Sequence, residues 1–258
     1  MHRREFIELA ALATALSTVG VTARAGEPVA GLIFPPANYP MPPDVKRLYP
    51  SGVSFIGNGL GFNGMTIESY DEALPRALPR AQELASQGAN LISVFGSSIT
   101  FYKGAKFNKE LCDKVTALTG LPATTQSNGL IDGLRHVNAR RVAVATAYTE
   151  TVTERLKIFL GEHGFEVASA TGLGYERTPE AANDDMLYEL GVGAYKLAGK
   201  ADALVLSCGG LRTLDVIVPL EKAIGVPVVS STPHGLWHCA RMLGVKTKIA
   251  GFGMVMAA

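Results

Sequence analysis

The sequence predicts an α/β protein made of two pseudo-symmetric lobes, each with a parallel sheet, and a site between them. Three observations predict this: short apolar runs alternate with longer amphipathic stretches, nearly every residue of those runs is apolar, and one order of features occurs twice. Strands buried on both faces need helices on either side, so the alternation indicates βαβ units with right-handed crossovers. With 258 residues and 47% hydrophobic side chains, the chain is long enough to bury such cores.

The first 25 residues have the features of an export signal. They contain, in order, Arg3-Arg4, Phe6, an apolar stretch over 9–21 and the small-residue cleavage site Ala23-Arg24-Ala25. Paired arginines followed by phenylalanine favour the Tat route, with an N-terminal helix as the alternative. The stretch is too short and too rich in Ala and Thr for a stable membrane span. We expect a signal over 1–25, a two-lobed unit over 26–258, and a periplasmic or exported protein, or a cytoplasmic one if the signal does not work.

Six apolar runs are expected to form strands, at 29–34, 53–56, 90–95, 141–147, 203–207 and 226–230. Amphipathic stretches between them predict helices at 70–87, 108–118, 129–138, 151–163, 184–197, 214–224 and 235–243. Pro75 and Pro79 should make the first helix irregular, because proline lacks the N–H that an inner helical residue donates.

An internal repeat supports two lobes. Four features recur in the same order: 89–98 matches 201–210, Gly120-Leu121-Pro122 matches Gly225-Val226-Pro227, Asn128-Gly129-Leu130 matches His234-Gly235-Leu236, and 141–146 matches 246–251. Chance similarity between buried strands is the alternative, but the matched order favours a true repeat. In this alignment Gly96 occupies the position of Cys208.

Composition excludes several classes of partner. The net charge is +1 and only 18% of the residues are charged, with no basic stripe interleaved with aromatics, so nucleic acid is not expected as a partner. The three cysteines have no metal-ligand spacing. Cys112 and Cys239 lie in helical patterns and are interpreted as small core-facing residues. Nothing in the sequence indicates an oligomeric state.

Two loops are candidates for an anion site. Gly96-Ser97-Ser98 and Cys208-Gly209-Gly210 each follow a predicted strand, and ligands of parallel sheets bind beyond the carboxyl ends of the strands. Glycine lets backbone N–H groups approach an anion, and the hydroxyls of Ser97 and Ser98 are further donors. Tyr148 ends another strand, so its phenol could donate to the same anion. Ordinary strand-to-helix turns, and a tyrosine at a loop rim, are the alternatives.

Cys208 is the candidate proton-handling residue. A thiol has a reference pKa of about 8.5, so it is mostly protonated near neutral pH. It can donate a proton to a carbanion or an enediolate, or remove one after deprotonation. Nearby amides would lower its pKa, and a proton donor requires that lowering to stay modest.

The two candidate loops and five further segments are similar to those of a known family, the bacterial arylmalonate decarboxylases. The resemblance is carried by 96–108, 206–215, Pro35-Pro36, Arg47-Leu48-Tyr49-Pro50, Gly59-Leu60-Gly61, 143–148 and 227–231. It extends from about residue 29 to residue 243. That family belongs to the aspartate/glutamate racemase superfamily, whose fold has two pseudo-symmetric α/β lobes with the active site between them, in agreement with the repeat.

The resemblance implies decarboxylation of a substituted malonate without a metal or organic cofactor. One carboxylate of this small dicarboxylate substrate would bind Ser97, Ser98, Tyr148 and the amide of Gly209, and Cys208 would protonate the resulting enediolate on one face to give a chiral monoacid. Residues at positions that shape the substrate pocket in the family are Pro35, Pro36, Phe62, Met65, Tyr70 and Gly96.

Gly96 separates this branch from its relatives, because racemases and maleate isomerases of the superfamily have a second cysteine there. Ser97 replaces a threonine of the family, and Phe62 and Met65 are bulkier than the family's aliphatic residues, which implies a different substrate preference. The alternatives are a cysteine-dependent racemase or cis–trans isomerase of a small carboxylate and, less favoured, an exported carboxylate-binding protein.

Overall fold

Two four-stranded parallel sheets form the centres of two lobes in the computed structural model, which describes residues 26–38, 40–62, 64–177 and 182–258. The predicted signal over 1–25 lies outside the described residues. Within the described ranges, no helix combines the length and apolarity needed to cross a membrane.

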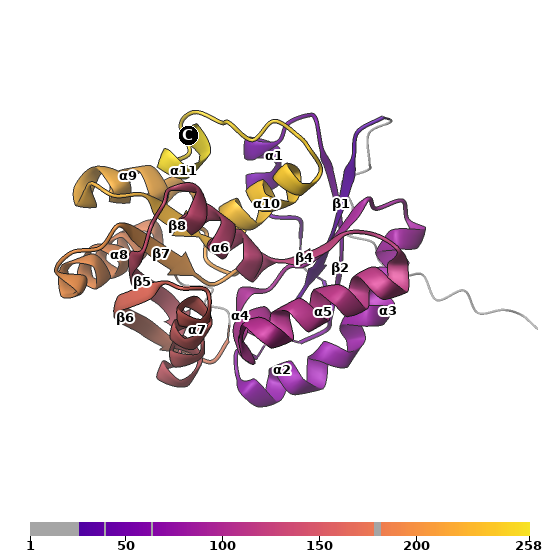
Figure 1. Cartoon of the computed structure of the whole chain (residues 1–258), viewed down its shortest axis with the longest axis horizontal. Coiled ribbons are helices and arrows are strands. Elements are labelled where there is room, and N and C mark those ends of the chain that lie inside the picture. The colour runs from indigo at the N-terminus through magenta and orange to yellow at the C-terminus, as the bar shows by residue number, and fades with distance from the viewer. Residues whose placement is uncertain (1–25, 39, 63, 178–181) are drawn as a thin grey trace, which may run out of the picture.

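The two sheets have the same strand order. The first is β2-β1-β3-β4, formed by β1 (Val29–Phe34), β2 (Ser54–Gly59), β3 (Leu91–Val94) and β4 (Ala123–Thr125). The second is β6-β5-β7-β8, formed by β5 (Arg141–Tyr148), β6 (Glu166–Tyr175), β7 (Ala203–Ser207) and β8 (Val228–Ser230). Neighbouring strands are parallel in both sheets, which confirms the predicted two-lobed α/β class (Figure 1).

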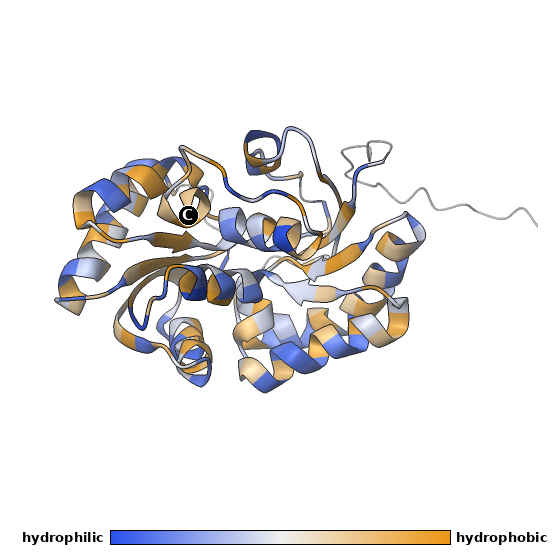
Figure 2. Cartoon of the chain, turned by 45° about the horizontal axis from the view of Figure 1, so that its top comes forward, coloured by the Kyte–Doolittle hydropathy of each residue, from blue (hydrophilic) through white to orange (hydrophobic). Residues whose placement is uncertain are grey.

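Helices cover the faces of both sheets. The first half of the chain forms α1 (Asp44–Leu48), α2 (Ile67–Ala73), the 3-10 helix η1 (Leu74–Arg76), α3 (Ala77–Ser86), α4 (Ser97–Phe101), α5 (Gly104–Thr119) and α6 (Gln126–His136). The second contains α7 (Glu150–Glu162), α8 (Asp184–Ala198), α9 (Leu214–Ile224), α10 (Ser231–Met242) and α11 (Met254–Ala257). Figure 2 shows mostly hydrophobic strands between helices that carry hydrophilic residues, as expected for sheets buried on both faces.

The predicted strands at 29–34 and 203–207 have the observed bounds, and both are buried throughout. The edge strand β6 was not predicted. Its residues are half-buried or exposed, so it lacks the continuous apolar run that marks the central strands. The short helix α1 also went unpredicted, because five residues are too few to show a helical period.

Three expectations are corrected. The helix expected over 70–87 begins at Ile67 and is divided into α2, η1 and α3, with the break at Pro75. The segment 246–251, matched in the repeat to a strand, forms no strand, because the counterpart of β5 is β1 and the second sheet is complete at β8. Ser97 and Ser98, expected in a loop, form the first turn of α4.

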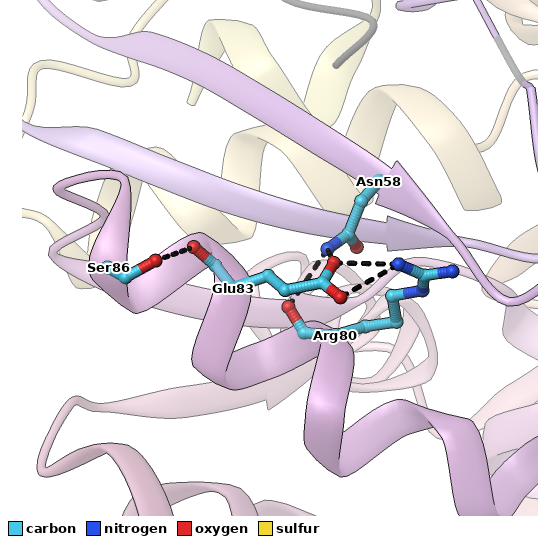
Figure 3. A network of polar contacts seen from close by, with 4 residues as sticks. All are labelled: Asn58, Arg80, Glu83 and Ser86. Atoms are coloured by element: carbon cyan, nitrogen blue, oxygen red, sulfur yellow. Dashed lines mark hydrogen bonds and ion pairs between the residues drawn. The ribbon is translucent and has the colours of Figure 1, made fainter. Parts of the chain in front are cut away.

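A polar network fastens the edge strand β2 to α3 (Figure 3). The Asn58 amide donates to the Arg80 carbonyl at 2.9 Å and to a carboxylate oxygen of Glu83 at 3.0 Å. Arg80 donates to both oxygens of the same carboxylate at 2.8 Å, so the charged pair orients an acceptor for one N–H of the Asn58 side chain. The outer strand of the first sheet is thereby held against its helix.

Helices α6 and α10 cross closely between the lobes (Figure 1). A methyl group built on Gly129 would lie 2.8 Å from the Cα atom of Gly235 and 2.8 Å from the carbonyl oxygen of His234. These are the glycines that recur in the repeat, so their recurrence has a steric cause. The backbones are in contact, and neither helix has room for a side chain there.

Gly129→Ala should therefore destabilise the protein by about 1–3 kcal/mol, because the added methyl group forces two backbones apart. Urea denaturation measures this change. Gly193→Ala in α8 is the matched control, since a methyl group there meets nothing within 4 Å and alanine favours a helix. Equal stability of the two variants would contradict the close crossing.

Candidate active site

A cavity lies between the lobes, where loops at the carboxyl ends of strands from both sheets meet. It is lined by Phe34, Pro35, Pro36, Pro42, Phe62, Gly64, Met65, Tyr70, Phe95, Gly96, Ser97, Ser98, Cys208, Gly209, Gly210 and Thr232. All site residues predicted from the sequence are in this set except Tyr148, which lies behind Ser97. No side chain in the lining set carries a charge.

Cys208 follows the last residue of β7 and is only 4% exposed. Its Sγ atom lies 3.8 Å from the Sδ atom of Met65, and its N–H donates to the Ser231 hydroxyl at 3.2 Å. Burial raises the pKa of the thiol to about 11, opposed by hydrogen bonds from the Gly210 N–H, the Tyr148 hydroxyl and the Leu211 N–H. The thiol therefore stays neutral, as a proton donor must.

A chain of buried hydroxyls extends from the thiol loop to the first lobe. Ser231 donates to the Ser97 hydroxyl at 3.1 Å, and Ser97 lies 3.0 Å from the phenol oxygen of Tyr148. The Tyr148 oxygen is also 3.4 Å from the Ser207 hydroxyl. Burial raises the pKa of Tyr148 well above its usual value, which keeps the phenol protonated. The chain joins β5, α4 and α10, so both lobes orient the Ser97 hydroxyl.

The Gly209 N–H is a backbone donor at the cavity wall. It forms no hydrogen bond within the described part of the chain, whereas the Cys208 N–H is bound by Ser231. A methyl group built on Gly209 would lie 2.8 Å from the side-chain oxygen of Gln126. Glycine is therefore required at this position of the cavity lining by close packing against Gln126.

The remaining wall is apolar. Phe62 and Tyr70 make an edge-to-face contact with their ring centroids 6.1 Å apart, and Met65 closes this side over the thiol. The backbone N–H of Met65 donates to the carbonyl of Glu176 in the second lobe at 2.7 Å. The apolar wall is thus fixed to both lobes.

Gly96 occupies the position in the first lobe that Cys208 occupies in the second. Val94 pairs with Thr125 as Leu206 pairs with Ser230, and each loop residue comes two positions later. A methyl group built on Gly96 would lie 2.8 Å from the Cγ atom of Pro35, so glycine fits a crowded wall. The other cysteines, Cys112 on α5 and Cys239 on α10, do not line the cavity.

Sequence reasoning missed Ser231, Thr232 and Gln126. The first two begin α10 directly after β8, and Gln126 begins α6 directly after β4. The signal for them in the sequence is the run of Thr and Ser residues in Thr124-Thr125 and Ser230-Ser231-Thr232, which follow the matched segments Gly120-Leu121-Pro122 and Gly225-Val226-Pro227. Among the described residues, no group of three or more His, Cys, Asp or Glu side chains is arranged to hold a metal ion.

Comparison with known proteins places this arrangement among decarboxylases. The sequence profile of the family described as arylmalonate decarboxylase matches residues 30–256. Arylmalonate decarboxylase of Bordetella bronchiseptica is 42% identical over 233 residues, which cover 89% of this chain and 97% of that protein. Maleate isomerase of Geobacillus stearothermophilus is 24% identical over 53% of this chain and 55% of its own length.

Solved structures agree with these sequence matches. A liganded arylmalonate decarboxylase double mutant, with one glycine changed to cysteine and one cysteine to serine, has a TM-score of 0.86 and 40% identity, covering 88% of this chain and 98% of its own. Maleate isomerase of Pseudomonas putida S16 has a TM-score of 0.83 at 21% identity, over 90% of this chain and 98% of its own, and shares the fold.

The raised thiol pKa has a direct consequence for reactivity. At pH 8.5 the folded protein should be alkylated by iodoacetamide at Cys208 about a hundredfold more slowly than the urea-unfolded protein, because the thiolate is the nucleophile. Peptide mapping by mass spectrometry assigns the label. The raised pKa also makes the free energy of unfolding depend on pH. Because folding favours the neutral thiol, the stabilisation from this shift is fully present below the pKa of the unfolded thiol and is lost as the pH rises towards 11. Fast labelling of the folded protein at pH 8.5 would contradict the burial argument.

Proposed function

The chain belongs to the arylmalonate decarboxylase family, and from this premise we propose that it decarboxylates substituted malonates, with Cys208 as the proton donor. The observation that carries the proposal is a single buried thiol facing a cavity of neutral hydrogen-bond donors on one side and apolar side chains on the other. The protein is a carboxy-lyase with an aryl- or alkenyl-substituted malonate as its substrate class.

The retained carboxylate binds on the polar side of the cavity. The hydroxyls of Ser97 and Ser98 and the Gly209 N–H are its donors, and Tyr148 holds the Ser97 hydroxyl from behind. Because these donors are neutral, they bind the carboxylate without a fixed cation, and they gain strength as charge accumulates on its oxygens in the enediolate. Together they form the proposed oxyanion hole.

The departing carboxylate lies against the apolar wall of Phe62, Met65 and Tyr70. A charged group is poorly solvated there, which favours its loss as neutral CO₂. The bond between the central carbon and this carboxylate breaks, and its electron pair is delocalised into the enediolate. The Cys208 thiol then transfers its proton to the central carbon, and the thiolate regains a proton from water.

The lining residues disfavour the alternative reactions. A racemase that exchanges protons on both faces needs a second acid–base group opposite Cys208, and Gly96 has no side chain to supply one. An amino-acid substrate would bring an ammonium group, and none of the described residues that line the cavity has an acidic side chain to bind it. One-sided protonation by Cys208 instead predicts a single enantiomer of the product.

Cys208→Ser should lower the rate of CO₂ release from methyl(phenyl)malonate by at least about a thousandfold, because a serine hydroxyl is a far weaker acid than a thiol. Ser97→Ala should cost about 10²–10³-fold through loss of one oxyanion donor. Cys112→Ser is the matched control, since that thiol lies outside the cavity. Near-normal turnover by Cys208→Ser would disprove the acid role. Isomerisation of maleate without CO₂ release would support an isomerase, and binding without turnover a binding protein.

Moving the thiol tests the pseudo-symmetry. The double variant Gly96→Cys, Cys208→Ser should form the opposite product enantiomer, with reduced activity because the new side chain crowds Pro35. Gly96→Ala with Cys208→Ser introduces the same crowding without a thiol and should be inactive. Chiral chromatography of the product measures the outcome. An unchanged enantiomer would contradict protonation from opposite faces by the two loops.

A further inference from the structure

A hydrogen-bonded pair from opposite lobes holds the loop that follows Cys208. The Thr232 hydroxyl donates to the carbonyl oxygen of Gly209 at 3.0 Å. The Gln126 side-chain amide donates to the same hydroxyl oxygen at 3.1 Å, so the Thr232 proton is directed at Gly209. Gln126 lies in the first turn of α6 and Thr232 in the first turn of α10.

This contact fixes the direction of the next amide. The peptide between Gly209 and Gly210 is planar and trans, so its N–H points away from its carbonyl. With the carbonyl held by Thr232, the Gly210 N–H points to the opposite side of the peptide, and this amide opposes burial by lowering the pKa of the Cys208 thiol. The orientation of a donor that stabilises the thiolate therefore depends on a hydroxyl on the other side of the peptide.

Packing leaves this peptide little freedom to rotate. Gln126 is fully buried, and its amide lies where a Gly209 side chain would begin. A methyl group built on Gly235 would lie 3.0 Å from the Cγ atom of Gln126, so the glutamine is confined on its other side as well. Thr232 is 4% exposed, which protects both of its hydrogen bonds from water.

We propose that Thr232 and Gln126 are positioning residues that set the reactivity of Cys208 by fixing the peptide between Gly209 and Gly210. The inference concerns the proton donor of the proposed reaction, and it rests on the proposed function for its catalytic meaning. The titratable groups that face the thiol are Tyr148 of β5 and Tyr70 of α2, and both are neutral at physiological pH because burial raises their pKa values. No charge on either tyrosine therefore outweighs the effect of the Gly210 N–H on the thiol.

Thr232→Val tests the proposal, because valine keeps the shape and removes the hydroxyl. The measurement is the rate of iodoacetamide alkylation of Cys208 between pH 8 and 9.5, by peptide mapping, which needs no turnover and so stays independent of the proposed reaction. We expect about a tenfold slower rate at each pH, since one hydrogen bond to the thiolate is lost and its pKa rises by about one. Thr232→Ser keeps the hydroxyl and should stay within about twofold of wild type.

The direction of the change separates positioning from simple loosening. A loosened loop would expose Cys208 and raise the alkylation rate, whereas a misdirected amide lowers it. Thr124→Val is the matched control, because Thr124 is an equally buried threonine whose hydroxyl bonds His238 and Asn128 away from the cavity. It should be less stable but be alkylated like wild type.

A wild-type or faster rate in folded Thr232→Val would overturn the proposal. If that variant does not fold, Gln126→Met carries the test. It removes the donor that orients the Thr232 hydroxyl, and we expect about a threefold slower alkylation. An unchanged rate in Gln126→Met would then overturn the proposal.

Discussion

Burial of one thiol at the junction of two lobes is the constraint on which this protein depends. A proton donor must remain protonated, and removal from water keeps Cys208 neutral far above physiological pH. The same burial would prevent proton transfer from the thiol if no group stabilised the thiolate that forms. The Gly210 N–H meets that need, and its peptide is held by contacts that cross between the lobes. The packing of the two lobes therefore also determines the acid strength of the Cys208 thiol.

The two lobes are alike in framework and different in chemistry. Equal strand orders bring equivalent loops to the cavity, and the glycine contact between α6 and α10 lets the lobes approach closely. The difference that bears on proton transfer lies at one loop position, which is Gly96 in one lobe and Cys208 in the other. A symmetric framework thus supports one-sided proton delivery. The crowding of Gly96 by Pro35 shows that the first lobe is shaped around the missing side chain.

Much of the fold and the cavity lining could be predicted from the sequence, for identifiable physical reasons. Central strands such as β1 and β7 are buried on both faces, so they are rich in apolar residues and could be predicted. The residues of the edge strand β6 are half-buried or exposed, so this strand has no continuous apolar run and was missed. Residues that line the cavity follow strands directly, which made Ser97 and Cys208 recognisable. Gln126 and Thr232 act through hydrogen bonds between segments 106 residues apart, and no local pattern encodes such a contact. The resemblance supplied the apolar wall, which periodicity alone does not distinguish from core.

The central claim is that a single thiol protonates one face of a planar intermediate. Turnover of methyl(phenyl)malonate in deuterium oxide, with chiral chromatography and mass spectrometry of the product, tests it most directly. The account predicts one deuterium at the carbon next to the carboxylate and a single enantiomer of the monoacid, because the exchanged Cys208 thiol is the only delivering group. A racemic product carrying the same single deuterium would contradict it, since protonation would then reach both faces.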